Sequence, residues 1–117
     1  MTVAQSLENV VARAKSLEAI RRQDLHCGDC LLVTTQNSVY TVWPLFDGYF
    51  WVWGGWFDRL GRSPHKVTIN GCTWGGCVIK QDVLAAVGLQ LEFGNNVRTT
   101  RIRRIQVMRG QAGPSLN

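Results

Sequence analysis

The side chains most able to do chemistry in this sequence are four cysteines in two short pairs. Cys27 and Cys30 have the spacing C-x2-C, Cys72 and Cys77 have the spacing C-x4-C, and 41 residues separate the pairs. Two such pairs can present four thiolates to a zinc ion. The wide C-x4-C pair and the long separation fit common zinc motifs poorly, however. One cysteine of each pair also opens an apolar run, which is typical of buried, reduced thiols.

We therefore expect no cofactor, and zinc held by Cys27, Cys30, Cys72 and Cys77 is the alternative. A disulfide or a redox pair is a further alternative. Redox pairs of the C-x2-C type lie at the start of a helix, where the helix terminus lowers the thiol pKa. Here the motif opens a predicted strand, so its context disfavours redox chemistry.

A second set of reactive side chains lies in one predicted loop, and it consists of Asp58, Arg59, Arg62, Ser63 and His65. An acid, a hydroxyl and an imidazole could meet there around a substrate. Catalytic triads are assembled in space rather than along the sequence, and loops carry polar residues because they face water. The chain contains no GxxxxGK, HExxH or GxSxG motif. A small enzyme that uses the loop 58–65 is therefore kept only as a second alternative.

The net charge of +5 is concentrated near the end of the chain. Residues 94–117 contain five arginines and no acid, whereas the charges of residues 1–93 balance. Such a patch attracts phosphates or acidic partners, although basic residues on an edge strand also prevent unwanted strand pairing. The first alternative function is thus nucleic-acid binding, with an aromatic side chain stacked on bases. Its candidate phosphate contacts are Arg98, Arg101, Arg103 and Arg104.

The stretch GYFWVWGGWFD, residues 48–58, has two apolar faces. In an extended strand Tyr49, Trp51 and Trp53 face one side, and Phe50 and Val52 face the other. We expect Phe50 and Val52 to fill a barrel interior. The opposite face then needs a cover, which is the N-terminal helix of the same chain, a second subunit or a ligand.

Aromatic residues are enriched at the centres of protein interfaces. We therefore predict that Tyr49, Trp51, Trp53 and Trp56 bind a partner, which is a second copy of the chain or an unknown protein or small-molecule ligand. The two glycines after Trp53 are expected to let the chain kink or bulge.

The elements that position these residues are mostly strands. Apolar residues spaced by three and four predict an amphipathic helix over residues 3–22. From Cys30 onward, β-branched and aromatic runs alternate with turn residues, which indicates about seven short strands. Turns are predicted at residues 36–37, 47–48 and 94–96, and a single helical turn at 81–87. A bulge near residues 103–104 would put Ile102, Ile105 and Val107 on one face.

The predicted fold class is α+β and mainly β, with an N-terminal helix followed by a small antiparallel barrel or strongly curled sheet. We expect one domain over residues 1–110, with a β-rich body at 30–109 and a flexible tail at 111–117. No leader peptide and no apolar run long enough for a membrane span is evident, so a cytoplasmic protein without a membrane partner is expected. The predicted function is a non-catalytic binding protein that forms a homodimer through its helix and aromatic strand.

Overall fold

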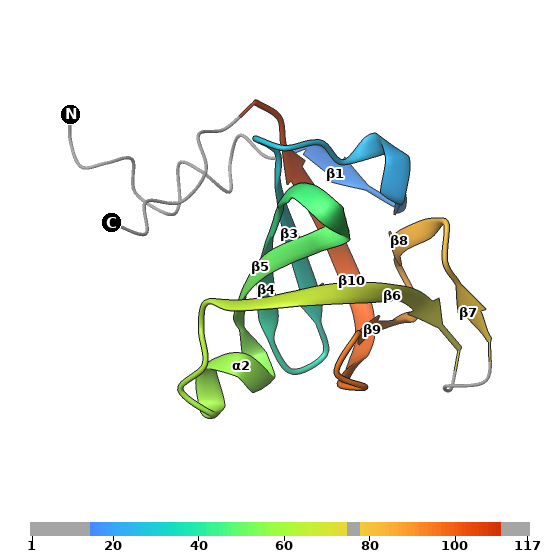
Figure 1. Ribbon diagram of the computed structural model, residues 1–117. Helices are drawn as coiled ribbons and strands as arrows, with labels where there is room; N and C mark the ends of the chain where they lie inside the picture. Colours follow the sequence, from blue (N-terminus) through green and yellow to red (C-terminus); the bar gives the residue numbers. More distant parts are fainter. Residues whose placement is uncertain (1–14, 75–77, 111–117) are drawn as a thin grey trace.

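A computed structural model describes residues 15–74 and 78–110, and their backbone is mainly extended (Figure 1). The strands are β1 (Lys15–Leu17), β2 (Ala19–Arg21), β3 (Cys30–Thr35), β4 (Val39–Pro44), β5 (Tyr49–Gly54), β6 (His65–Thr73), β7 (Ile79–Lys80), β8 (Val83–Ala86), β9 (Gln90–Phe93) and β10 (Arg98–Met108). The short helices are η1 (Arg22–Asp24), η2 (Phe46–Gly48) and α2 (Gly55–Arg59).

Six strands close into an antiparallel barrel, which confirms the predicted mainly β barrel, although the sequence predicts about seven strands and the described residues form ten. Their order around the barrel is β10, β3, β4, β5, β6 and β9, and β9 pairs again with β10. Strand β1 extends this sheet beside β10, and β7 extends it beside β6. Strands β2 and β8 form a separate two-stranded sheet. A closed barrel leaves its six strands without a free edge, because each has a neighbour on both sides.

The predicted turns connect the strands where expected. Between β3 and β4, the N–H of Thr35 donates to the Ser38 carbonyl at 2.8 Å. Between β4 and β5, Asp47 has a φ of 66°, and between β9 and β10, Asn96 has a φ of 68°. Asn and Asp tolerate this left-handed region better than most residues, which explains their presence at the two positions.

The predicted bulge in β10 is also confirmed. The pairing of β10 with β3 shifts between Ile102 and Arg104, so Arg103 is an extra residue. Because of the shift, Ile102, Ile105 and Val107 all point into the core, where each is at most 2% exposed.

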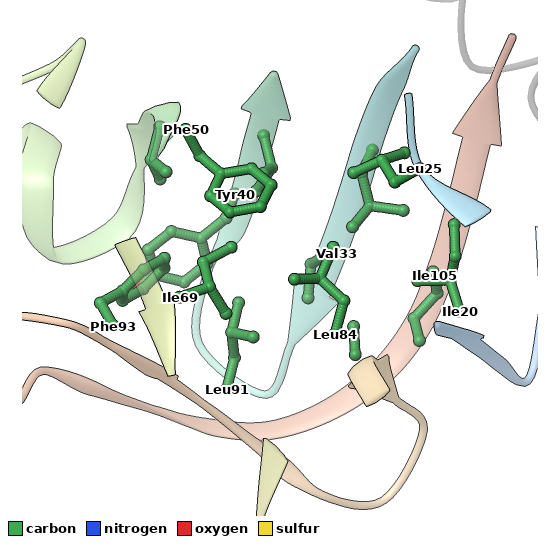
Figure 2. Packing of buried hydrophobic residues seen from close by; sticks show 14 of the residues in the cluster. Ile20, Leu25, Val33, Tyr40, Phe50, Ile69, Leu84, Leu91, Phe93 and Ile105 are labelled. Carbon is green, nitrogen blue, oxygen red and sulfur yellow. The ribbon is translucent and has the colours of Figure 1, made fainter. Parts of the chain in front are cut away.

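A single apolar cluster fills the interior and runs from Ile20 in β2 to Val107 in β10. Phe50 and Val52 of β5 belong to it, which confirms the predicted interior face of the aromatic strand. Figure 2 shows side chains of the barrel strands converging with Leu84 of β8, which reaches in from outside the barrel wall. Every residue that alternates with these core positions must therefore face away from the interior.

Helix α2 closes one end of the barrel with an aromatic cluster. The ring of Phe57 is fully buried and packs edge-on against Phe93 at 5.0 Å and Tyr40 at 6.3 Å between centroids. Trp56 packs edge-on against the same ring at 5.2 Å, and His65 stacks on it at 5.4 Å. These contacts fix α2 to β4, β6 and β9.

Two glycines let β5 turn directly into α2, which confirms the predicted kink. Gly54 and Gly55 have φ values of 106° and 49°. A Cβ at Gly54 would lie 2.0 Å from the Val39 carbonyl oxygen, and one at Gly55 would lie 2.3 Å from the Tyr40 ring. Side chains at these positions would thus collide with β4.

The predicted helix over residues 3–22 is wrong for its described part, and residues 3–14 lie outside the described residues. Residues 15–21 form β1 and β2 instead. Strand β1 pairs with β10 through Lys15 and Val107, and β2 pairs with β8 through Ala19 and Ala86. Ile20 joins the barrel core in this extended form. Tertiary strand pairing thus outweighs the helical spacing of the apolar residues.

Two further local predictions need correction. The helical turn predicted at 81–87 contains strand β8, because pairing with β2 places Leu84 and Ala85 in the core. The first two residues of the predicted loop 58–65 belong to helix α2, which buries Phe57 and ends at Arg59. The predicted tail at 111–117 lies outside the described residues.

Candidate binding surface

The outer wall of the barrel carries two neighbouring rows of side chains that cross its strands. On β10, β3, β4 and β5 the directly opposed residues are Gln106, Leu32, Thr41 and Trp53 in one row. The neighbouring row contains Arg104, Thr34 and Val39. All these side chains point outward, because the residues that alternate with them form the core.

The two rows line an apolar groove of about 390 Å³, which we call the outer groove. Its lining residues include Leu32, Thr34, Val39, Thr41, Trp53 and Arg104. The groove exists because two threonines lie between the bulky side chains of Trp53 and Arg104. Val39 lies at its margin with half of its surface exposed (52%).

Charges of opposite sign stand at the outer groove, where Arg104 of β10 and Asp58 of α2 both line it. The Asp58 carboxylate accepts a hydrogen bond from the Gly54 N–H at 3.1 Å, which anchors it near the groove. The Arg104 guanidinium is exposed, and it has no hydrogen bond or ion pair with any described residue. The groove is thus apolar in the middle with a positive and a negative group at its edges.

The rest of the aromatic face continues along β5. Trp51 is directly opposite Trp43 of β4, and both rings are half-buried. The ammonium group of Lys66 lies over the Tyr49 ring at 5.0 Å from its centroid, which is a cation–π contact. Trp51 and Tyr49 are therefore partly covered by their own neighbours, whereas Trp53 opens onto the outer groove.

The fourth predicted aromatic residue, Trp56, lies elsewhere. It belongs to α2, packs on Phe57, and lines a different cavity at the end of the barrel. The structure thus groups Tyr49, Trp51 and Trp53 on one face and separates Trp56 from them.

The four predicted arginines are distributed around β10. Arg104 faces the outer groove, and Arg103 is the exposed extra residue of the bulge. The Arg101 guanidinium lies 4.6 Å above the ring of Trp74, which is 58% exposed. Arg98 lines two cavities at the barrel end. Sequence alone leaves the spatial relation of arginines and aromatics open, and the structure places Arg101 over the ring of Trp74.

Two other arginines form several hydrogen bonds each. Arg22 of η1 donates from Nε to the Gln81 carbonyl at 2.9 Å. From Nη2 it donates to the carbonyls of Ile69 at 2.7 Å and Asn70 at 3.4 Å. It thereby attaches the first described segment to β6.

Arg109 forms the second such contact, which we call the Asp29–Arg109 clip. Its Nη1 lies 2.9 Å from the Asp29 carboxylate, which is 6% exposed, and it also donates to the Asp24 carbonyl. Asp29 further accepts hydrogen bonds from the backbone N–H groups of His26 at 2.8 Å and Gly110 at 3.1 Å. Burial acts to raise the pKa of Asp29, but these hydrogen bonds and the Arg109 charge together lower the pKa below its ordinary value.

The described cysteines do not come together. Cys72 lies in the core with its thiol 3.5 Å from the Leu84 carbonyl, whereas Cys30 lies on the outer side of the wall opposite Met108. Cys27 is exposed, and Cys77 lies outside the described residues. Burial raises the pKa of the Cys30 and Cys72 thiols to about 11, which keeps them protonated near neutral pH. Within 15–74 and 78–110, no three metal-ligating side chains gather at one point.

The three triad-like residues of the loop 58–65, which are Asp58, Ser63 and His65, have structural partners. Asp58 and Ser63 both accept from the Gly54 N–H, and His65 stacks on Phe57. Arg59 is exposed and lines the cavity at the end of the barrel, and Arg62 is also exposed. In this part of the chain the three triad-like groups thus engage the backbone or an aromatic ring rather than one another.

Sequence reasoning missed several residues that shape these sites. Trp43, Thr41 and Val39 alternate along β4, and pairing β4 with β5 across the predicted turn would have placed them beside Trp51 and Trp53. No local signal predicts that Arg59 and Arg98 line the same cavity, because this depends on where α2 packs.

Comparisons with known proteins add no assignment to this geometry. No protein-family model matches the sequence, and neither a characterised protein nor a solved structure is similar to it. Among the described residues, the helices are too short to cross a membrane.

Proposed function

We propose that this protein is a non-catalytic binding module that associates with a second copy of itself through the outer groove. The observation that carries the proposal is that a knob, a hollow and a pair of opposite charges share one face. Val39 is the exposed knob, and the space over Thr34 and Thr41 is the hollow. Arg104 and Asp58 are the charges.

A surface of this kind suits a two-fold interface, in which the same patch of both copies must be self-complementary. A two-fold axis through the groove brings Arg104 of each copy toward Asp58 of the other. Val39 of each copy then meets the apolar lining that contains Trp53. Aromatic side chains in such a position carry much of the binding energy of an interface, whereas the charge pairs set its register.

The oligomeric state of Val39→Lys tests the proposal. Because Val39 is exposed, lysine leaves the fold intact but puts a charge into the apolar contact. Sedimentation velocity should show a dimer for the wild type and a monomer for Val39→Lys. Val87→Lys is the matched control, since Val87 is exposed but lies away from the groove, and it should remain a dimer. A monomeric wild type would refute self-association.

A charge swap tests the register. Arg104→Asp and Asp58→Arg should each weaken the dimer, and the double variant should restore it, because the opposite charges are exchanged across the axis. Ser63 still accepts the Gly54 N–H when Asp58 is replaced, so the start of α2 keeps its anchor. Arg103→Asp, one residue away on the bulge, is the control and should leave the dimer unchanged. Failure of the double variant to recover would exclude this register.

A second candidate function is nucleic-acid binding, and the contact of Arg101 with the exposed Trp74 ring favours it. Arginine beside an exposed aromatic ring is the combination that single-strand binding surfaces use. Titration with oligothymidine at low salt should then quench tryptophan fluorescence, and binding should weaken steeply as salt rises. Trp74→Ala should remove the quenching, whereas Phe46→Ala, a control at another exposed aromatic residue, should not. No binding at low salt would eliminate this candidate.

A further inference from the structure

A small cavity at the end of the barrel gathers positive charge without a balancing acid. It lies among the β3–β4 turn, helix α2 and the start of β10, which meet at the lower end of the barrel in Figure 1. Its volume is about 90 Å³, room for roughly three waters or one small polyatomic ion. Arg59 from α2 and Arg98 from β10 both line it, and no Asp or Glu does.

Neither arginine is neutralised by the protein itself. Arg59 and Arg98 have no hydrogen bond or ion pair with any residue in the described ranges. Glu92 is opposite Arg98 in the strand ladder, but its carboxylate accepts a hydrogen bond from the Asn70 side chain at 2.8 Å. Both arginines are exposed and both line the cavity, so an anion bound there has two guanidinium groups within reach.

Hydrogen-bond donors complete the lining of the cavity. The Tyr40 hydroxyl oxygen accepts from the Trp56 N–H at 3.3 Å, so its own proton remains available. The Thr100 hydroxyl is buried and has no hydrogen-bond partner among the described residues. A buried polar atom without a partner is costly, and it indicates a group that the bare protein lacks.

A larger cavity of about 550 Å³ adjoins the small one and shares Arg98, Thr99 and Thr100 with it. Gln90 also lines it, and the amide oxygen of Gln90 is a second buried atom without a described partner. This oxygen can only accept hydrogen bonds, so it suits a hydroxyl group of a ligand. Donors thus surround the small cavity, and an unpartnered acceptor lines the large one.

We infer that the small cavity binds the phosphate group of a phosphate monoester whose hydroxyl-bearing body occupies the larger cavity. Arg59 and Arg98 pair with the phosphate oxygens, because the planar guanidinium matches oxyanions with two parallel hydrogen bonds. Tyr40 and Thr100 donate to the remaining oxygens, and Gln90 accepts from the body. The site lies at the barrel end, apart from the outer groove, and does not depend on self-association.

Calorimetric titration at constant ionic strength tests the inference, with ribose 5-phosphate, inorganic phosphate and ribose as probes. Ribose 5-phosphate should bind saturably and more tightly than inorganic phosphate, and ribose should not bind. Arg59→Gln and Arg98→Gln should each weaken ribose 5-phosphate binding about tenfold or more, since each removes charge-assisted hydrogen bonds. Arg103→Gln, which removes the same charge from the bulge of the same strand, should leave binding unchanged.

A second variant separates the site from general charge and from stability. Thr100→Val removes only the unpartnered hydroxyl, so the protein should fold at least as stably while ribose 5-phosphate binds several-fold more weakly. The absence of saturable binding, or an equal loss in Arg103→Gln and Arg98→Gln, would overturn the site. Equal affinities for inorganic phosphate and ribose 5-phosphate would overturn the role of the larger cavity.

Discussion

The arginines at the two ends of the barrel have opposite surroundings. At the end where β10 finishes, Arg109 meets the buried Asp29 carboxylate, and Arg22 donates to three carbonyls of β6 and the β7–β8 connection. At the end where β10 starts, Arg59 and Arg98 share a cavity without an acid. Arginine thus joins segments at one end, and at the other end it is exposed at a cavity and has no described partner.

This difference separates arginines that stabilise the fold from arginines that are available to bind. A guanidinium with several acceptors contributes to folding, and its loss leaves buried acceptors unpaired. A guanidinium held in a cavity without acceptors contributes little to folding. Substitutions of the arginines with acceptors should therefore lower stability and leave ligand binding unchanged. Substitutions of Arg59 and Arg98 should weaken ligand binding and leave stability nearly unchanged.

The largest effect should come from the clip itself. Asp29→Ala leaves the N–H groups of His26 and Gly110 and the Arg109 guanidinium without their shared acceptor. We expect the free energy of unfolding to fall by about 3 kcal/mol, because a nearly buried partner is removed. Urea unfolding followed by tryptophan fluorescence measures this. A loss within about 0.5 kcal/mol, the range of ordinary surface substitutions, would show that the clip is not structural.

Arg22→Gln should have the next largest effect. Its side chain bonds to backbone carbonyls of three residues, two of them part-buried contacts. A loss of about 2 kcal/mol is expected in the same unfolding assay. Arg21→Gln is the matched control, since Arg21 is exposed and adjacent, and it should change stability by less than about 0.5 kcal/mol.

A smaller effect should appear as a pH dependence. The pKa of Asp29 is lowered in the folded protein, so the stability from its charge is complete above the unfolded pKa of about 4. It is lost as the pH falls through the folded value. Asp29→Asn should therefore be less stable than wild type at pH 7, by about 1 kcal/mol, and the two curves should converge in acid. A constant difference between pH 7 and pH 2 would contradict the role of the charge.

The smallest effect on folding should be that of Arg98→Gln. Because Arg98 has no described partner, the substitution should change the free energy of unfolding without ligand by less than about 0.5 kcal/mol. Relief of the repulsion with Arg59 acts to stabilise the folded state slightly. If Arg98→Gln destabilised the protein as much as Arg22→Gln, the division between the two barrel ends would be wrong. Parallel urea unfolding of the two variants makes this comparison direct.

The sequence predicts the wall of the barrel better than its ends. Alternation in β5 and the irregular spacing around Arg103 correctly place Phe50, Val52 and Ile105 in the core, because a strand has only two faces. The turns follow from Asp and Asn at positions of positive φ. The error at residues 15–22 arises because Leu17 and Ile20 also fit a helix, and only pairing with β10 and β8 decides between the two.

The candidate sites were predictable only where they lie on one strand. Trp51 and Trp53 share a face by alternation, but only the strand order β10, β3, β4 and β5 places Arg104 and Trp53 along the same groove. The Arg59–Arg98 cavity depends on the packing of Phe57, which a short pattern does not reveal. Long-range topology thus determines both sites.

The pairing of β1 with β10 also determines how the described chain resists a pulling force. Lys15 is opposite Val107, so both ends of the described chain emerge at the same end of the barrel. Tension between them peels β1 from β10 one pair at a time instead of shearing all three pairs together. The Asp29–Arg109 clip lies at the same end of the barrel, because Arg109 directly follows β10. The pulling force therefore acts on the clip before it acts on the barrel strands. A protein built this way unravels from its paired ends under modest force, while the six-stranded barrel stays closed until those contacts have opened.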